Sequence, residues 1–265
     1  MQWSLEVKET WLHRVNPSFK LLGMLLLFFV VVFIHNINIL LNMTIFMLLL
    51  YFIATGHVTK VKLLLLIPFL LIFLSAMAPM AMFGKGDTTW LKLGLIHVTE
   101  ESFYRGVHLG LRATVFGILG LLFALTTKPV LLFYSLMQQC KLPPKYAYSF
   151  LAAVRLIPIM IEEFITLRKA LMVRGVENKK GIKVMFSKLQ FYSIPLLSQS
   201  IRRAHRIAVA MEAKRFSKQK NRTYYYNVTM TKNDLIYVSV FCILIGTSYF
   251  LSVNYPYFSV TDVRY

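Results

Sequence analysis

Two short basic motifs carry the side chains best suited to binding a partner. One is Val173-Arg174-Gly175 and the other is Ala213-Lys214-Arg215. A guanidinium is a planar, permanently charged fork that pairs with carboxylates and carbonyls, whereas an ammonium is a flexible point charge. Each motif closes a long stretch with the composition of a helix. We therefore expect Arg174, Lys214 and Arg215 to bind a partner from the ends of two helices.

These two helices are predicted over residues 144–175 and over about 183 to 219, with a polar hinge of residues 175–181 between them. The first contains Pro158, which predicts a kink. Gly175 suits the left-handed conformation that ends helices. A short helix is predicted before them, from the capping residues Thr126-Thr127-Lys128-Pro129 to about Cys140.

Small residues recur at a spacing of four in both long helices, which places them on one face of each. Small side chains let two helices approach closely, so these residues predict that the helices cross. The opposite face of the second helix carries Arg202, Arg203 and Arg206, for which binding to anionic lipid headgroups is an equally good interpretation. The small residues are Ser149 and Ala153 in the first helix and Ser200, Ala204 and Ala208 in the second.

Catalytic chemistry finds little support in the sequence. Glu162 and Glu163 are the candidates for an enzyme at the membrane face, but adjacent residues point about 100° apart on a helix, which favours a solvated surface. No Gly-x-x-x-x-Gly-Lys-Ser/Thr loop is present to cradle a nucleotide. Cys140 and Cys242 lack the spacing of zinc ligands. We therefore predict a non-catalytic chain with no metal site and no cofactor.

Composition and charge point to a membrane protein. Of 265 residues, 57% are apolar and 15% are charged, which lies outside the balance of soluble domains. The formal net charge is nevertheless +19, and residues 128–232 hold 20 Lys and Arg against four Asp and Glu, which leaves +16 in that region. Basic residues concentrate on the cytoplasmic side of membranes, so this region is predicted to be cytoplasmic. Nucleic acid is the other partner that such charge suggests, but nucleic-acid modules rarely alternate with lipid-compatible runs.

Five apolar runs predict transmembrane helices, because a bilayer core of about 30 Å needs roughly 20 helical residues. None of the runs contains Asp, Glu, Lys, Arg or His, the residues on which ion-coupled transporters depend inside the membrane. The neutral segment 84–108 is predicted to be a loop on the far side. The runs are 21–34, 39–54, 63–83, 113–127 and 235–251.

The predicted fold is an all-α polytopic membrane protein with about five transmembrane helices and long crossed cytoplasmic helices. Three regions follow: a membrane domain of four spans at 1–127, the basic cytoplasmic region at 128–232, and a final span with a short tail at 233–265. With the basic region inside, the N-terminus of this cell-membrane protein is expected in the cytoplasm and the C-terminus outside.

Several motifs, in order along most of the chain, resemble those of one transporter family. The first runs from Leu12 to Leu21 as LHRVNPSFKL, with Asn16 where Asp is usual. Gly110-Leu111-Arg112, Leu125-Thr126-Thr127, Leu142-Pro143-Pro144 and Arg155-Leu156-Ile157-Pro158 follow, and Glu162-Glu163 comes after them. Together with the two basic motifs, they resemble the transmembrane coupling (T) component of energy-coupling factor transporters, relatives of the cobalt-transport permease.

The resemblance implies a scaffold that joins two cytoplasmic ATPase subunits to a separate small membrane subunit, which captures a vitamin or a metal ion. In the family, two Ala-Arg-Gly motifs dock into the ATPases, whose closure moves the coupling helices and topples the substrate subunit. On this register Arg174 and Lys214 are the docking residues, and Arg215 replaces a glycine. Loss of that glycine predicts that the second helix continues toward Lys218, with Arg215 about 100° around it from Lys214.

Two other readings of the sequence stay open. Among transporters, the alternative is an ordinary ABC importer permease that forms its own substrate path between its spans. Outside them, it is a lipid-surface scaffold without transport. In the resembled family the choice of cargo belongs to another polypeptide, so no vitamin or metal is assigned from this chain.

Overall fold

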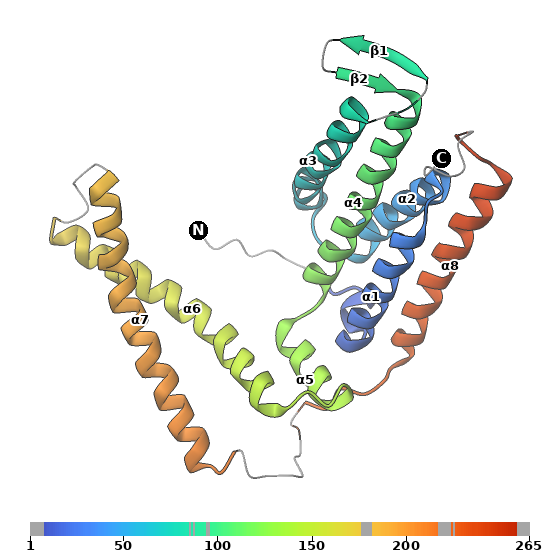
Figure 1. Ribbon diagram of the computed structural model, residues 1–265. Helices are drawn as coiled ribbons and strands as arrows, with labels where there is room; N and C mark the ends of the chain where they lie inside the picture. The colour runs from blue at the N-terminus through green and yellow to red at the C-terminus, as the bar shows by residue number, and fades with distance from the viewer. Residues whose placement is uncertain are drawn as a thin grey trace. The chain divides into compact units, whose positions relative to one another are not determined.

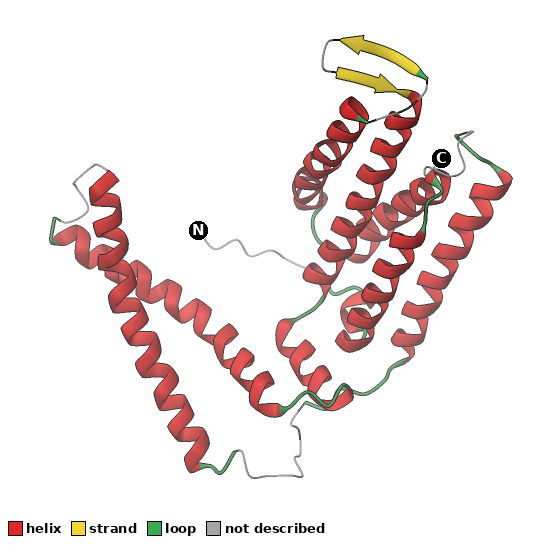
Figure 2. Cartoon of the chain, in the orientation of Figure 1, coloured by secondary structure: helices red, strands yellow, loops and turns green. Residues whose placement is uncertain are grey.

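The computed structural model describes residues 8–84, 86, 88–93, 96–175, 182–216, 224 and 226–258. Within these residues one short antiparallel hairpin is the exception to an otherwise helical chain (Figures 1 and 2), which confirms the predicted all-α class. The elements in order are η1 (Trp11–Arg14), α1 (Pro17–Phe33), α2 (Ile37–Ala54), α3 (Thr59–Phe83), β1 (Thr89–Leu93), β2 (Ile96–Thr99), α4 (Glu100–Thr126), α5 (Pro129–Gln139), α6 (Pro144–Val173), α7 (Ile182–Ala213) and α8 (Lys232–Asn254).

The chain divides into two compact units. Met1–Ser135 and Val228–Tyr265 form the first, which we call the membrane unit, and Leu136–Asn227 form the second, which we call the crossed-helix unit. The membrane unit contains α1 to α4 and α8, and the crossed-helix unit contains α6 and α7. Helix α5 belongs partly to each unit, because the division falls after Ser135.

Four helices of the membrane unit, α2, α3, α4 and α8, are long and apolar enough to cross a bilayer. Helix α1 is also apolar but has 17 residues, a length of about 26 Å. Helix α3 shows why lipid is the appropriate solvent: of its 25 residues only Lys62 and Ala81 are buried. Lipid accepts such an apolar surface without the cost that water would impose. The exposed side chains of α3 include Leu63, Leu64, Ile67, Leu70, Leu71 and Leu74.

The predicted far-side loop at 84–108 is wrong in part. Strands β1 and β2 pair antiparallel within this segment, Leu91 with Val98 and Leu93 with Ile96. Helix α4 already begins at Glu100. The Thr99 side chain accepts a hydrogen bond from the Ser102 amide, and Glu100 and Glu101 occupy the first turn. An N-cap threonine followed by acidic residues stabilises a helix start. Two of the charges that suggested a loop, those of Glu100 and Glu101, therefore belong to the first turn of α4.

Glycines of α4 bring it into close contact with α3. A methyl group added at Gly106 would lie 2.8 Å from the Met77 carbonyl oxygen and 3.1 Å from the Ala81 amide nitrogen, and one at Gly110 would lie 2.8 Å from the Phe73 ring. At Gly106 a larger side chain would have to move backbone atoms of α3, and at Gly110 it would have to move the Phe73 ring. Gly106 and Gly110 are four residues apart and lie on one face of α4, which is the spacing that packs membrane helices closely.

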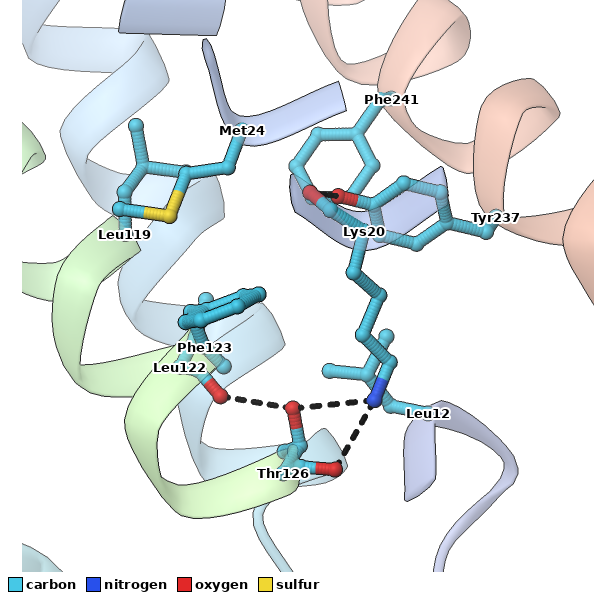
Figure 3. A pocket seen from close by; sticks show the side chains of 9 residues that line it. All are labelled: Leu12, Lys20, Met24, Leu119, Leu122, Phe123, Thr126, Tyr237 and Phe241. Carbon is cyan, nitrogen blue, oxygen red and sulfur yellow. Dashed lines mark hydrogen bonds between the residues drawn. The ribbon is translucent and has the colours of Figure 1, made fainter. Parts of the chain in front are cut away.

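Polar side chains from neighbouring helices close several helix ends of the membrane unit. Arg112 in α4 donates a 2.8 Å hydrogen bond to the Ile34 carbonyl after α1, and the Lys62 ammonium lies 2.5 Å from the Phe52 carbonyl near the end of α2. The buried Lys20 ammonium donates 2.9 Å to the Thr126 carbonyl at the end of α4 (Figure 3). The cavity beside Lys20 has a volume of about 20 Å³, room for one water molecule.

We expect Gly106→Ala to lower the thermal stability of the purified protein, because overpacking a close contact costs about 1–3 kcal/mol. Gly246 in α8 is the matched control, since nothing lies within 4 Å of a methyl group there. Gly246→Ala should leave the melting temperature in detergent unchanged or slightly higher. Equal melting temperatures for Gly106→Ala and the wild type would contradict the packing described for α3 and α4.

Candidate functional site

The first basic motif stands at the end of α6. The Arg174 amide donates to the Ala170 carbonyl at 3.2 Å, and the Gly175 amide donates to the Met172 carbonyl at 3.0 Å. Gly175 has a positive φ of 72° and terminates the helix. Both motif residues are exposed, and Val173 before them is 89% exposed. The Arg174 guanidinium therefore stands at a helix end in solvent, beside an apolar side chain.

The second motif ends α7 in the same way. The Lys214 amide donates to the Ala210 carbonyl at 3.2 Å, and the Arg215 amide donates to the Glu212 carbonyl at 2.8 Å. Phe216 then closes the turn through a 3.0 Å bond from its amide to the Met211 carbonyl. A bond spanning five residues outside one spanning three is the Schellman arrangement, which requires a left-handed residue at its centre. Arg215, with a φ of 54°, is that residue.

The expectation that α7 continues through Arg215 is therefore wrong. A glycine is favoured at the left-handed position, and an arginine there costs roughly 1 kcal/mol more, but the two capping bonds and the packing of Phe216 hold it. Lys218, toward which the helix was expected to run, lies outside the described residues. In backbone terms Lys214 is the counterpart of Arg174, and Arg215 is the counterpart of Gly175.

The two motifs lie at opposite ends of the crossed-helix pair. Figure 1 shows the end of α6 close to the start of α7, and α7 then runs 32 residues, about 48 Å, before the second motif. Phe216 packs edge to face on Tyr148 near the start of α6, with ring centroids 5.0 Å apart. Such a contact is favourable for aromatic rings and fixes the second helix end on the first helix.

Polar and aromatic contacts hold the two helices where they cross. Glu163 forms an ion pair with Arg203, and the Ser200 hydroxyl lies 3.1 Å from the Met160 sulfur. Phe164 packs against Tyr192 with ring centroids 5.3 Å apart. The carboxylate and guanidinium are only 20% and 27% exposed, so solvent screens this pair less than a surface pair.

Of the five small residues predicted to line the crossing of α6 and α7, one lies in the contact and four are exposed. Ser200 lies in the contact, whereas Ser149, Ala153, Ala204 and Ala208 are exposed. The Ser149 hydroxyl donates to the Lys145 carbonyl of its own helix. Larger side chains make the contacts between α6 and α7 instead, from Tyr148 with Phe216 near the start of α6 to Phe164 with Tyr192 beyond the ion pair.

The predicted basic face of α7 is also divided. Arg203 turns to Glu163, and Arg202 donates a 2.9 Å hydrogen bond to the Ser198 hydroxyl one turn earlier. Arg202 and Arg206 are exposed. These two arginines remain able to meet an anionic surface, whereas Arg203 has a structural partner.

A groove of about 490 Å³ lies between α6 and α7 and contains both candidate acids of the enzyme reading. The Glu163 carboxylate forms an ion pair with Arg203. The Thr166 hydroxyl donates a 2.9 Å hydrogen bond to the backbone carbonyl of Glu162. Among the residues that line the groove, a nucleophile aligned with an acid–base pair is therefore not found. The lining residues are Ile159, Glu162, Glu163, Thr166, Leu167, Ala170, Pro195, Leu196 and Gln199.

Large apolar side chains are exposed along both helices of the crossed-helix unit. Neither helix is among the four that are long and apolar enough to span a bilayer, although they have 30 and 32 residues. Exposed apolar surface rimmed by charge marks an interaction surface. The exposed residues include Phe150, Ile157, Ile161, Ile165, Phe186, Leu189, Phe191, Ile194, Leu197 and Ile201.

A buried polar cluster at the start of α1 was missed as a site by sequence reasoning. Asn16, Ser18, Ser135 and Asp234 are all buried there and bond to one another. Asn16 and Ser18 belong to the motif of residues 12–21, but their partners Ser135 and Asp234 lie more than 100 residues away in the sequence. The available signal was Asp234, a lone acid at the beginning of an apolar run.

Comparison with known proteins matches residues 8–225 to the family described as Cobalt transport protein, CbiQ. Three curated relatives carry the name energy-coupling factor transporter transmembrane protein. The Brevibacillus brevis protein is 28% identical over 249 residues, 89% of this chain and 92% of its own. The Listeria innocua protein is 29% identical over 81% of this chain and 84% of its own, and the Bacillus subtilis protein is 27% identical over 90% and 93%.

We expect Arg215→Gly to slow amide exchange at the end of α7, because glycine adopts the left-handed conformation without strain. Arg215→Val should speed it, since a β-branched side chain disfavours that conformation and weakens the capping bonds of residues 215 and 216. Hydrogen–deuterium exchange of peptides covering residues 205–216 measures both effects. If Arg215→Val exchanged like the wild type, the left-handed helix end would be the wrong description.

Proposed function

Because this chain belongs to the cobalt transport protein family, we propose that it couples two cytoplasmic ATPase subunits to a separate membrane subunit that binds a vitamin or a metal ion. Its relatives identify the chain as the transmembrane component of an energy-coupling factor transporter. In this proposal ATP hydrolysis belongs to the partner subunits, and the chain itself is non-catalytic.

One observation carries the docking proposal: two basic residues occupy the same position in two equivalent helix ends. Arg174 and Lys214 each precede a residue with positive φ, and each is exposed. Two similar ATPase subunits need two similar attachment points. The separation of about 48 Å along α7 suits subunits that bind side by side.

The geometry also supports a mechanical role for the crossed helices. A helix is stiff along its axis, so movement of an ATPase at one tip displaces the whole of α6 or α7. The Glu163–Arg203 pair and the Phe216–Tyr148 contact make the two helices move as one body. The exposed apolar side chains of α6 and α7 are the surface that the proposed membrane subunit would cover.

The alternative of an ordinary permease needs a substrate path through the membrane unit. The cavity among α1, α4 and α8 has room for one water molecule. It is lined mainly by apolar side chains, as Figure 3 shows. The relatives, which carry the name of the energy-coupling factor transporter transmembrane protein, favour the coupling role, in which another subunit carries the cargo.

Orientation follows from charge. We place the basic region 128–232 and the N-terminus in the cytoplasm and the C-terminus outside, with α1 as a fifth span. The docking residues then face the compartment that contains ATP. Anionic lipid of the same leaflet is the proposed neighbour of the exposed Arg202 and Arg206.

We expect Arg174→Ala to weaken binding of the ATPase subunits that co-purify with the wild type roughly 10- to 100-fold, because hydrogen bonds to charged groups contribute about 1.5–3 kcal/mol. Arg174→Lys retains the charge at the helix end but loses the fork, so it should restore only part of the affinity. Full affinity for Arg174→Lys would show that the charge alone suffices.

At the second motif, Lys214→Ala should weaken ATPase binding more than Arg215→Ala, and both should weaken it less than Arg174→Ala. Lys214 holds the docking position, but an ammonium pairs less specifically than a guanidinium. Titration of the three variants with the same ATPase preparation gives the order. A loss confined to Arg215→Ala would assign docking to the left-handed residue.

Cysteine labelling tests the orientation. Cys140 and Cys242 are both free and exposed, so they are first replaced by serine. Asn178→Cys and Asn254→Cys should then react with a membrane-impermeant maleimide from opposite sides of sealed vesicles. Reaction of both from one side would refute the proposed topology.

A further inference from the structure

Two stretches of chain connect the membrane unit and the crossed-helix unit. Helix α5 leads out, with Ser135 the last residue of the membrane unit, and the chain returns at Val228 just before α8. Within the crossed-helix unit the Gln138 side chain donates a 2.5 Å hydrogen bond to the Tyr226 carbonyl. The outgoing and returning stretches are therefore tied to each other.

The outgoing stretch is anchored at the start of α1. The Ser135 hydroxyl donates to the Asn16 side-chain oxygen at 2.5 Å and accepts from the Ser18 amide at 3.2 Å. It also lies 2.5 Å from the Ser18 hydroxyl. Ser135 is completely buried, and a serine side chain is too short to reach these partners from another backbone position. The anchor therefore fixes α5 to α1 at one point.

The returning stretch is anchored on the same residues. One oxygen of Asp234 accepts a 2.7 Å hydrogen bond from the Asn16 amide, and the other accepts 2.8 Å from the Thr231 amide. Asp234 is 5% exposed. A buried carboxylate held by two backbone amides is a strong, directional contact. Asn16 thus contacts both stretches, through its side chain and through its backbone.

From the start of α1 the contacts continue to the other helices of the membrane unit. The Lys20 ammonium reaches the end of α4 at Thr126, and the Tyr237 hydroxyl of α8 donates to the Lys20 carbonyl at 3.3 Å. All of these residues are buried. Buried hydrogen bonds therefore connect Ser135 through α1 to α4 and α8.

We propose that Ser135, Asn16 and Ser18 form the anchor through which movement of the crossed-helix unit is transmitted to the membrane unit, with Ser135 as the positioning residue. The inference rests on the proposed function, because that function supplies the movement. Without the anchor, α5 would follow α6 while α1 stayed in place.

The test uses the full chain with its co-purified ATPase subunits in lipid nanodiscs. Hydrogen–deuterium exchange is compared between ADP and ATP with vanadate, for the wild type, Ser135→Ala and the control Ser239→Ala. Ser239 is exposed in α8 and donates to the Leu235 carbonyl of its own helix. Ser18→Ala is the second variant, since it keeps the bond between Ser135 and Asn16.

In the wild type and in Ser239→Ala, the nucleotide should change exchange in α6 and α7 and also at the starts of α1 and α8. In Ser135→Ala the change should persist in α6 and α7 but fall at least twofold at the starts of α1 and α8, with Ser18→Ala intermediate. If Ser135→Ala showed the full nucleotide-dependent change in exchange at α1 and α8, or an equal loss of that change in both units, the proposed anchor would be wrong. A wild type without any nucleotide effect in α6 and α7 refutes the proposed function instead.

Discussion

Backbone groups at helix ends beside lipid need hydrogen-bond partners, because the hydrocarbon offers none. The membrane unit meets this constraint with long polar side chains from neighbouring helices. Lys20 closes the end of α4, and Arg112 closes the end of α1. Each of these bonds joins two helices that are far apart in sequence. The charged residues nearest the membrane therefore serve to hold the bundle together, which agrees with the absence of ionisable residues from the central apolar runs.

In the crossed-helix unit, charged side chains lie between the helices and apolar side chains lie on the surface. Its polar contact, Glu163 with Arg203, lies where the helices cross, and its large apolar side chains are exposed. An exposed apolar surface of this kind is typical of a site that another molecule covers. A unit with an exposed apolar surface and a basic residue at each end is suited to join other subunits, which is the role that we propose for this chain.

The two helix ends show how one backbone geometry can be reached with different residues. Gly175 adopts the left-handed conformation freely, whereas Arg215 adopts it because Phe216 packs on Tyr148 and the capping bonds form. The second end therefore depends on tertiary contact and the first does not. The backbone geometry that the two ends share makes Lys214 the counterpart of Arg174, although the local sequences differ.

Hydrophobic runs, proline and glycine positions and the clustering of basic residues are local signals, so the sequence alone determined the membrane class, nearly all of the helices and the two basic motifs. The same local signals gave a wrong start for α4, where acidic residues stabilise the first turn. They also gave a wrong end for α7, where an arginine adopts a conformation typical of glycine. Only the tertiary structure decided that Ser200, of the five small residues, lies in the contact between α6 and α7, and that Asn16 joins Ser135 and Asp234. Those outcomes depend on which surfaces pack together across 40 residues of chain at the crossing and across 119 and 218 residues at Asn16. No spacing within a single helix encodes that choice.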